Sequence, residues 1–345
     1  MVASSGPSTP RPEGIGSITA PIEAHLQALE RYLLDEVSSF EPEVQELVRY
    51  TFQHSGKKIR PILVFYSGWT GEGEEPPTDL IRAAAIVELV HLATLVHDDI
   101  LDNADLRHRT PTVAHRYGAH AAVLLGDAVF AHALKLAADF PTTFVCREVA
   151  QATRQVCSGE IAQTFARGRA DLSLPAYYRM IDLKTAELFR VSALLGATLT
   201  HPASGFPEAA AEFARRLGIA YQIFDDLADL FSSEDKAGKT LGTDLASGKF
   251  TLPFLLWFPT LTDAQQQEWI RRINTHPDAV LELRAEWEQA GILPKVVDAF
   301  RHELRLATEA LEPYQELPAA QRLPRLLGFV EAACAKLLAQ IGYQE

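Results

Sequence analysis

Apolar side chains recur along most of the chain at the spacing of amphipathic helices. Ile22, Leu26, Leu29, Leu33 and Val37 follow one another at intervals of three or four residues, which places them on one helical face. The same spacing predicts further helices at 44–52, 112–139, 143–168, 175–199, 207–231, 250–258, 263–273 and 277–290, with more before the C-terminus. Alternating runs rich in β-branched residues are scarce, so the pattern predicts an all-α fold of about a dozen helices without strands.

The segment from Leu80 to Asn103 is apolar almost all round. A helix without a polar face is either buried on every side or spans a membrane. Because Arg82, Glu88 and His91 interrupt the segment, we expect a buried helix and no transmembrane segment. The Ser-, Pro- and Gly-rich start lacks the apolar region of a signal peptide, so we expect a disordered tail at 1–18 and a single large helical domain at 19–345.

The composition of the chain argues against some classes of binding partner. The net charge of −13 argues against binding to nucleic acid or to an anionic membrane surface. Cys146, Cys157 and Cys334 show no metal-ligand spacing and are typical of a protein of the reducing cytoplasm, where we expect this chain to act. The overall charge would repel an anionic substrate, so local cations or metal ions would have to hold it.

Two clusters of aspartates end apolar helical segments. In "DDILD", Asp98 and Asp102 lie four residues apart, so both carboxylates project from one helical face, with Asp99 beside them. Such charges repel unless a divalent cation lies between them, and carboxylates suit Mg²⁺, which is usually shared with substrate phosphates. A solvated helix end would explain one cluster, but "FDDLADL" repeats the arrangement at Asp225, Asp226 and Asp229. Two facing clusters could hold two or three Mg²⁺ ions around a diphosphate.

Basic residues accompany both clusters. Lys57 and Arg60 lie three residues apart just before Pro61, on what we expect to be one helical face. The others are Arg107, Arg109, Lys184, Lys239 and Lys249. Arg pairs with phosphate oxygens through two parallel hydrogen bonds, and Lys adds a point charge. Each alone is more often a surface residue, but their positions beside the aspartates favour phosphate binding.

These motifs occur together in a recognisable order. "GKKIRP", "HDDILDNADLR", "LKTAELF", "YQIFDDLADL" and "GKTLGTDLASGKFTLP" follow one another between about residues 45 and 255. In this the chain resembles the trans-isoprenyl diphosphate synthases, the polyprenyl synthetase family. The resemblance implies an isoprenoid synthase fold with a central apolar cavity, and a homodimer. It also implies Mg²⁺-dependent condensation of isopentenyl diphosphate with an allylic diphosphate (dimethylallyl, geranyl or farnesyl).

The resemblance also implies roles for individual residues. Asp98, Asp102 and Asp225 would ligate the metal ions, and Asp99, Asp226 and Asp229 would complete the clusters. The allylic diphosphate would be held by Arg107, Lys184, Lys239 and Lys249, and isopentenyl diphosphate by Lys57, Arg60 and His91. Thr185 and Gln222 would present oxygens near the forming cation.

One position departs from the family pattern. The family usually has Arg-Arg-Gly after the first cluster, and its second Arg binds isopentenyl diphosphate. Here the chain reads "RHRT", so His108 stands at that position and Arg109 replaces the glycine. A histidine gives one hydrogen bond where a guanidinium gives two, so Arg109 is the alternative residue for this role.

Residues along the helix before Asp98 bear on product length. One isoprene unit is about as long as one helical turn of about 5.4 Å, so side chains one turn apart would act as successive gates. The first gates are Ala93, Thr94 and Val90, and none is aromatic. In the family, bulky rings at the first gate stop growth at farnesyl diphosphate. We therefore expect a longer product, with a geranylgeranyl diphosphate synthase as the alternative.

Three other functions fit parts of the pattern. His97-Asp98 is compatible with an HD-type metal phosphohydrolase, but that class leaves the second aspartate cluster unused. A terpene cyclase also uses DDxxD on an all-α fold, but has no use for "GKKIR". A non-catalytic subunit of a heteromeric synthase would tend to lose its aspartates, whereas this chain keeps both clusters.

Overall fold

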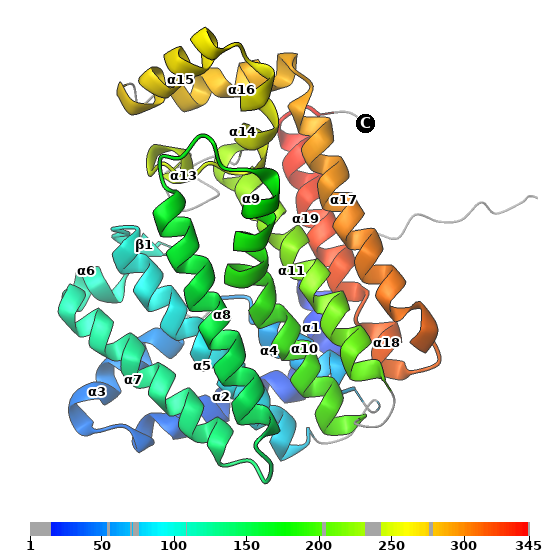
Figure 1. Cartoon of the computed structure of the whole chain (residues 1–345). Coiled ribbons are helices and arrows are strands. Elements are labelled where there is room, and N and C mark those ends of the chain that lie inside the picture. The colour runs from blue at the N-terminus through cyan, green and yellow to red at the C-terminus, as the bar shows by residue number, and fades with distance from the viewer. Residues whose placement is uncertain are drawn as a thin grey trace, which may run out of the picture.

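The described elements of the computed structural model are almost all helices (Figure 1). It describes residues 15–53, 56–69, 71, 76–107, 109–201, 205–231, 243–275 and 279–343. The first helices are α1 Ile15–Thr19, α2 Glu23–Glu36, α3 Pro42–Gln53, α4 Ile59–Ser67, α5 Thr78–Leu101, α6 Val113–Tyr117, α7 Ala119–Ala138 and α8 Phe144–Ala166. The others are α9 Leu174–Ile181, α10 Glu187–Thr200, α11 Phe206–Phe231, α13 Thr243–Ala246, α14 Leu252–Trp257, α15 Asp263–Thr275, α16 Ala279–Gln289, α17 Ile292–Leu311, α18 Pro318–Arg322 and α19 Arg325–Gln340.

Helix α5 lies at the centre of the fold, as its all-round apolar sequence predicts. It packs against α2, α4, α7 and α10, and its buried residues include Ala83, Ile86, Val87 and Leu89. Helices α5 and α7 are both long and apolar enough to cross a membrane, but 67% of the apolar window of α5 is buried inside the protein. Burial against other helices removes this surface from water without a bilayer.

In the first 60 residues, the structure differs from two of the sequence predictions. The predicted tail boundary is too late, because Ile15–Thr19 form α1 and Ile18 is fully buried; residues 1–14 lie outside the described part. The prediction of Lys57 and Arg60 on one helical face was wrong as well. Helix α4 begins at Ile59 after Lys58 in a left-handed conformation (φ 54°), so Lys57 precedes the helix and Arg60 lies in its first turn. Pro61 fits this turn because the amides there need no intrahelical partner.

Two further segments differ from the predicted helices. The helix expected at 112–139 is divided into α6 and α7 at Gly118, whose φ of 92° favours glycine. Just before it, β1 Leu106–Arg107 pairs antiparallel with β2 Thr110–Pro111, a hairpin too short for alternation to reveal. The helix expected at 175–199 is interrupted by a π-helical turn, Asp182–Ala186, which we call the π-turn.

Candidate active site

The two acidic clusters meet in one region of the fold. Asp98 and Asp99 lie in the last turn of α5 and Asp102 caps it, while Asp225, Asp226 and Asp229 lie near the end of α11. Lys249 joins the two clusters: its Nζ donates to both carboxylate oxygens of Asp102 at 2.9 Å and lies 3.5 Å from Asp244. The backbone amide of Asp244 donates to Asp229 at 3.3 Å.

Cations surround the first cluster. Arg167 Nη2 donates to Asp102 at 2.8 Å, and Lys184 Nζ donates to Gln163 at 2.7 Å and pairs with Glu160. Burial acts to raise the pKa of Asp102, but Lys249, Lys184 and Arg167 outweigh it and lower that pKa. For Asp98, burial wins: it raises the pKa to about 6, with Glu160 and Asp102 adding to it and Lys184 opposing it. The carboxylates of Asp98, Asp102 and Glu160 therefore lie close together, and nearby cations stabilise their negative charge.

Asp99 differs from its neighbours because it is buried and paired. Nε and Nη2 of Arg107 lie 2.8 and 2.7 Å from its Oδ1. Arg107, predicted to hold the allylic diphosphate, is therefore tied to α5 in this structure. Its side chain is still about one third exposed, at 35%, which leaves a face open to a ligand.

The three aspartates of the second cluster are not equivalent. Asp225 is exposed, whereas Asp226 and Asp229 are buried. Asp226 accepts hydrogen bonds from Tyr177 Oη at 2.5 Å and Gln222 Nε2 at 2.9 Å. Burial raises the pKa of Asp226 to about 8, although both hydrogen bonds oppose the shift. The other end of the Gln222 amide accepts a hydrogen bond from Thr185 Oγ1 at 2.7 Å, so the π-turn and α11 share one network.

The residues predicted to bind isopentenyl diphosphate are only partly brought together. The Arg60 guanidinium lies over the Phe189 ring at 4.8 Å, and burial lowers its pKa to about 10, opposed by Glu88, Tyr221 and Asp98. Burial, together with Arg60 and Arg107, holds the pKa of His91 well below its usual value. Lys57 is exposed and lies over Phe329 of α19 instead, 5.5 Å from the ring centroid.

Three predicted basic residues remain, of which the structure describes only Arg109. Arg109 is exposed and has a left-handed backbone, with φ of 65°. His108 and Lys239 lie outside the described residues.

A small cavity of about 30 Å³ lies beside the second cluster, where Asp226 and Lys249 both line it. Its polar lining comes from α8, α11 and the segment after α13: Gln163, Gln222, Asp226, Lys249 and Thr251. The apolar lining includes Ala166, Leu172, Met180, Ile181 and Phe250. Charged groups and a hydrophobic wall therefore share one space beside Asp226 and Lys249.

The gate residues lie on α5 below Asp98. Val90 and Ala93 are fully buried, at 0% exposure. Thr94, one turn from Asp98, keeps some exposed surface and donates its hydroxyl to the His91 carbonyl at 2.7 Å. Thr94 is thus the gate residue nearest to the aspartates with room beside it.

Sequence reasoning missed several residues of the site. Glu160, Gln163 and Arg167 of α8 and its C-cap contact Lys184 or Asp102, and Tyr177 and Asp244 contact the second cluster. A signal for the α8 group was present, because residues three, four and seven apart share one helical face. Tyr177 and Asp244 have no such signal, since only the tertiary fold brings them to α11.

The donor set fits magnesium. In the described part of the chain, no three His, Cys, Asp or Glu side chains form a group that could hold a metal alone. Mg²⁺ commonly binds through one or two carboxylates, with waters and substrate phosphates completing its shell. Asp98, Asp102 and Asp225 provide such carboxylates, so an ion would be shared with a bound diphosphate.

Comparisons with known proteins show the family to which this chain belongs. The model of the family "Polyprenyl synthetase" matches residues 41–288. An all-trans-nonaprenyl-diphosphate synthase (geranyl-diphosphate specific) of Rhodobacter capsulatus is 32% identical over 311 residues, covering 90% of this chain and 95% of the relative. The crystal structure of a decaprenyl diphosphate synthase from Rhodobacter capsulatus superposes with a TM-score of 0.84 at 25% identity, covering 94% and 99% of the two chains.

A second solved structure contains ligands. It is the polyprenyl synthase of Caulobacter crescentus complexed with calcium and isoprenyl diphosphate, with a TM-score of 0.83, 25% identity, and coverage of 94% of this chain and 99% of that one. The match to the family model spans most of the chain, and the fold matches throughout. The chain therefore belongs to the polyprenyl synthetase family and is a polyprenyl diphosphate synthase, a prenyltransferase.

Proposed function

We propose that this synthase adds isopentenyl units to an allylic diphosphate held between the two acidic clusters, and that its product is longer than geranylgeranyl diphosphate. The observation that carries the site assignment is the chain of contacts Asp102–Lys249–Asp244–Asp229. It connects α5 with α11 beside the cavity, so one diphosphate can reach both clusters. The HD-type reading has less support, because His97 turns to α7, where its Nε2 lies 3.2 Å from the Val123 carbonyl oxygen.

In this proposal the cations bind the substrate and the carboxylates bind metal. Lys184 and Lys249 are held by carboxylates and exchange these partners for phosphate oxygens when the allylic diphosphate binds. Asp98, Asp102 and Asp225 would hold Mg²⁺, which supplies positive charge that neutralises the departing diphosphate. Arg107 stays paired with Asp99 while its exposed face contacts phosphate.

The remaining residues protect the allylic cation that forms when the carbon–oxygen bond breaks. The Thr185 hydroxyl donates to Gln222 Oε1, so its own lone pairs are left to face positive charge. Gln222 is held in turn by its hydrogen bond to Asp226. The apolar wall excludes water, which would otherwise capture the cation. The double bond of isopentenyl diphosphate then attacks, and the proton lost from the adduct passes to the released diphosphate.

Product length is proposed from the gate residues and the relatives. No aromatic ring stands at Val90, Ala93 or Thr94, and the relatives named above include a nonaprenyl and a decaprenyl diphosphate synthase. The purified chain, incubated with farnesyl and isopentenyl diphosphates and Mg²⁺, should yield prenyl products longer than C20. A product that ends at C20 would favour the geranylgeranyl alternative. Phosphate release without condensation would contradict the proposal.

We also propose that the enzyme is a homodimer acting in the cytoplasm. Leu124 and Val123 of α7, and Ile161 and Phe165 of α8, are exposed by 68, 42, 56 and 79%. Helices α7 and α8 pack against each other, so these side chains belong to neighbouring elements. Large apolar side chains on adjoining helices are typical of a surface that a second copy covers.

A further inference from the structure

The π-turn that carries Lys184 and Thr185 is an unusual element inside a long helix. The amide of Glu187 donates to the carbonyl of Asp182, five residues back. The extra residue rotates the chain beyond it by about 100° relative to a regular α-helix. Such turns are rare and cluster at functional sites, so neighbouring groups must stabilise this one.

Two glycines let neighbouring helices touch the backbone of the π-turn. A Cβ on Gly159 of α8 would lie 2.5 Å from the Lys184 nitrogen. A Cβ on Gly218 of α11 would lie 2.6 Å from the Ala186 Cα. The π-turn is therefore held between α8 and α11, with no side chain between the backbones.

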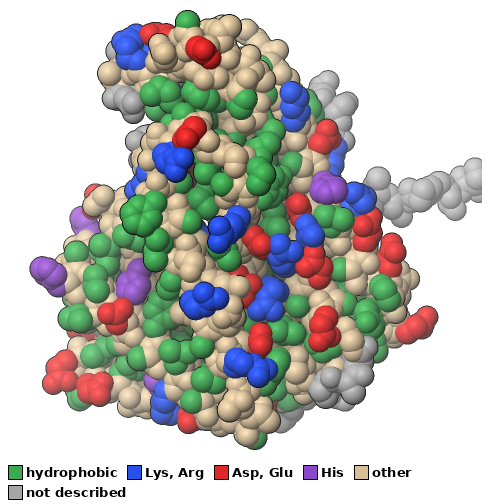
Figure 2. Space-filling model, in the orientation of Figure 1, with side chains coloured by type: hydrophobic (Ala, Val, Ile, Leu, Met, Phe, Trp, Pro, Cys, Tyr) green, Lys and Arg blue, Asp and Glu red, His purple; other side chains and the backbone are tan. Residues whose placement is uncertain are grey.

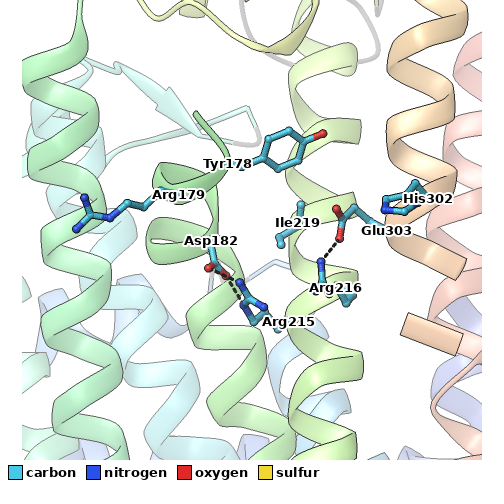
Figure 3. A pocket seen from close by; sticks show the side chains of 8 residues that line it. All are labelled: Tyr178, Arg179, Asp182, Arg215, Arg216, Ile219, His302 and Glu303. Atoms are coloured by element: carbon cyan, nitrogen blue, oxygen red, sulfur yellow. Dashed lines mark hydrogen bonds and ion pairs between the residues drawn. The ribbon is translucent and has the colours of Figure 1, made fainter. Parts of the chain in front are cut away.

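A pair of charged residues ties the π-turn to α11. Arg215 Nε and Nη2 each donate to a different oxygen of Asp182, both at 2.7 Å (Figure 3). This pair borders an open cleft of about 530 Å³ formed by residues of α9, the π-turn, α11 and α17. Figure 2 shows acidic and basic side chains gathered over the region where Figure 1 places α9, α10 and α11.

The Asp182–Arg215 pair and the hydrogen bond beside the cavity hold the π-turn at different residues. Asp182 begins the π-turn and binds Arg215, while Thr185, three residues later, binds Gln222 beside the cavity. Arg215 and Gln222 are seven residues apart on α11, so they project from similar directions two turns apart. The orientation of the π-turn against α11 is thus fixed at two points, only one of which is in the active site.

We propose that Asp182 and Arg215 are positioning residues that set where the π-turn presents Lys184 and Thr185 to the allylic diphosphate. This inference rests on the proposed roles of Lys184 and Thr185. A two-pronged pair fixes direction as well as distance, because two parallel charge-assisted hydrogen bonds permit little rotation. Loss of these two parallel hydrogen bonds, which we call the fork, lets the π-turn shift. Shifts of about 1 Å in a reacting group can lower rates about 100-fold.

The cleft also provides a matched control. Arg216, the next residue of α11, donates through Nη1 to Glu303 of α17 at 3.1 Å. The two arginines are similarly exposed, at 26% for Arg216 and 32% for Arg215, while Glu303 is more buried than Asp182, with 8 against 26% of its side chain exposed. Glu212 pairs with both arginines. Among the described residues, the hydrogen bonds and ion pairs of Arg216 and Glu303 do not reach the π-turn, so Glu303→Gln tests the loss of an ion pair outside that element.

The experiment compares steady-state kinetics and thermal unfolding of Asp182→Asn, Arg215→Gln, their double variant, Glu303→Gln and Lys184→Ala. Asp182→Asn and Arg215→Gln should each lower kcat/KM for farnesyl diphosphate by about tenfold or more. The KM for isopentenyl diphosphate should stay within about twofold, and the double variant should lose no more than the worse single variant. Glu303→Gln should keep wild-type kinetics at a comparable midpoint of unfolding.

The outcomes separate this inference from the proposed function. Wild-type kinetics in Asp182→Asn with an impaired Lys184→Ala would overturn the inference alone. Full activity in Lys184→Ala would instead refute the proposed role of that lysine. Losses that match those of Glu303→Gln at equal unfolding midpoints would also overturn positioning by Asp182. If Asp182→Asn does not fold, Arg215→Lys replaces it: this variant keeps the charge but loses the fork, and should lower the same kinetic constant.

Discussion

Lys249 places its Nζ 2.9 Å from both carboxylate oxygens of Asp102, across 147 residues of sequence. A glycine-rich segment late in the chain thereby reaches the end of the central helix α5. This contact neutralises the charge of an aspartate that we propose as a metal ligand. In the proposed function, the same lysine would bind a phosphate of the substrate.

Replacement of this lysine should damage substrate use without unfolding the protein. Lys249→Ala should lower kcat/KM for the allylic diphosphate by about 100-fold, because one charged donor to the developing diphosphate charge is lost. Lys135→Ala is the control, since Lys135 pairs with Asp139 at the end of its own helix and is 64% exposed. Equal activity of the two variants would remove Lys249 from the substrate site.

A ring one turn below Asp98 should shorten the product. Thr94→Phe places an aromatic side chain where Thr94 keeps exposed surface, so growth should stop earlier, within about one or two isoprene units, each about one helical turn long. Thr94→Val keeps the size and should leave the length distribution unchanged. Product sizing by chromatography decides the matter, and an unchanged distribution in Thr94→Phe would refute growth along α5.

The close approach at Gly159 should make it intolerant of a side chain. Gly159→Ala should destabilise the enzyme by about 1–3 kcal/mol, as overpacking does, because its Cβ meets the Lys184 backbone rather than a flexible side chain. Gly328→Ala in α19 meets nothing within 4 Å and should be neutral or slightly stabilising. Denaturant unfolding compares the two, and equal midpoints would contradict the packing described here.

His91 should make stability depend on pH. Its folded pKa lies well below 6.5, chiefly because of burial and also because of Arg60 and Arg107. As the pH falls through 6.5, the unfolded chain takes up a proton at this position and the folded protein does not. The contribution of His91 is therefore fully present above pH 6.5 and is lost below it. Between about pH 7 and about pH 5, the unfolding free energy of His91→Gln should decline less steeply than that of the wild-type protein. Equal slopes in the two proteins would contradict this prediction.

Charges on the exposed apolar side chains should abolish the dimer. Phe165→Glu combined with Leu124→Glu should yield a monomer in sedimentation velocity, whereas the wild-type chain should sediment as a dimer. The two residues are 79 and 68% exposed, so the substitutions disturb no core packing. A wild-type monomer, or a variant that still dimerises, would refute the assigned surface.

The sequence predicts most of the helices but not their irregularities. Periodicity reveals α5 and α11 because each buries long apolar runs. It misses α4, where the basic "GKKIRP" segment and Pro61 obscure the start. It also misses the π-turn, because α10 beyond it is buried on most sides, so the shift in phase caused by an extra residue does not show in the apolar pattern. The spacing of the aspartates identifies them, and the helical spacing of Glu160, Gln163 and Arg167 carries a signal too, whereas Tyr177 and Asp244 reach the second cluster only through the tertiary fold.

Binding stoichiometry tests the shared site most directly. Titration of the purified enzyme with a non-hydrolysable thio analogue of farnesyl diphosphate in the presence of Mg²⁺ should show one site per chain. Asp102→Asn and Asp225→Asn should each weaken that same binding by at least about tenfold, since each removes a ligand of the metal-bound diphosphate. Two independent sites, each lost in only one of these variants, would show that the acidic clusters do not hold a common diphosphate.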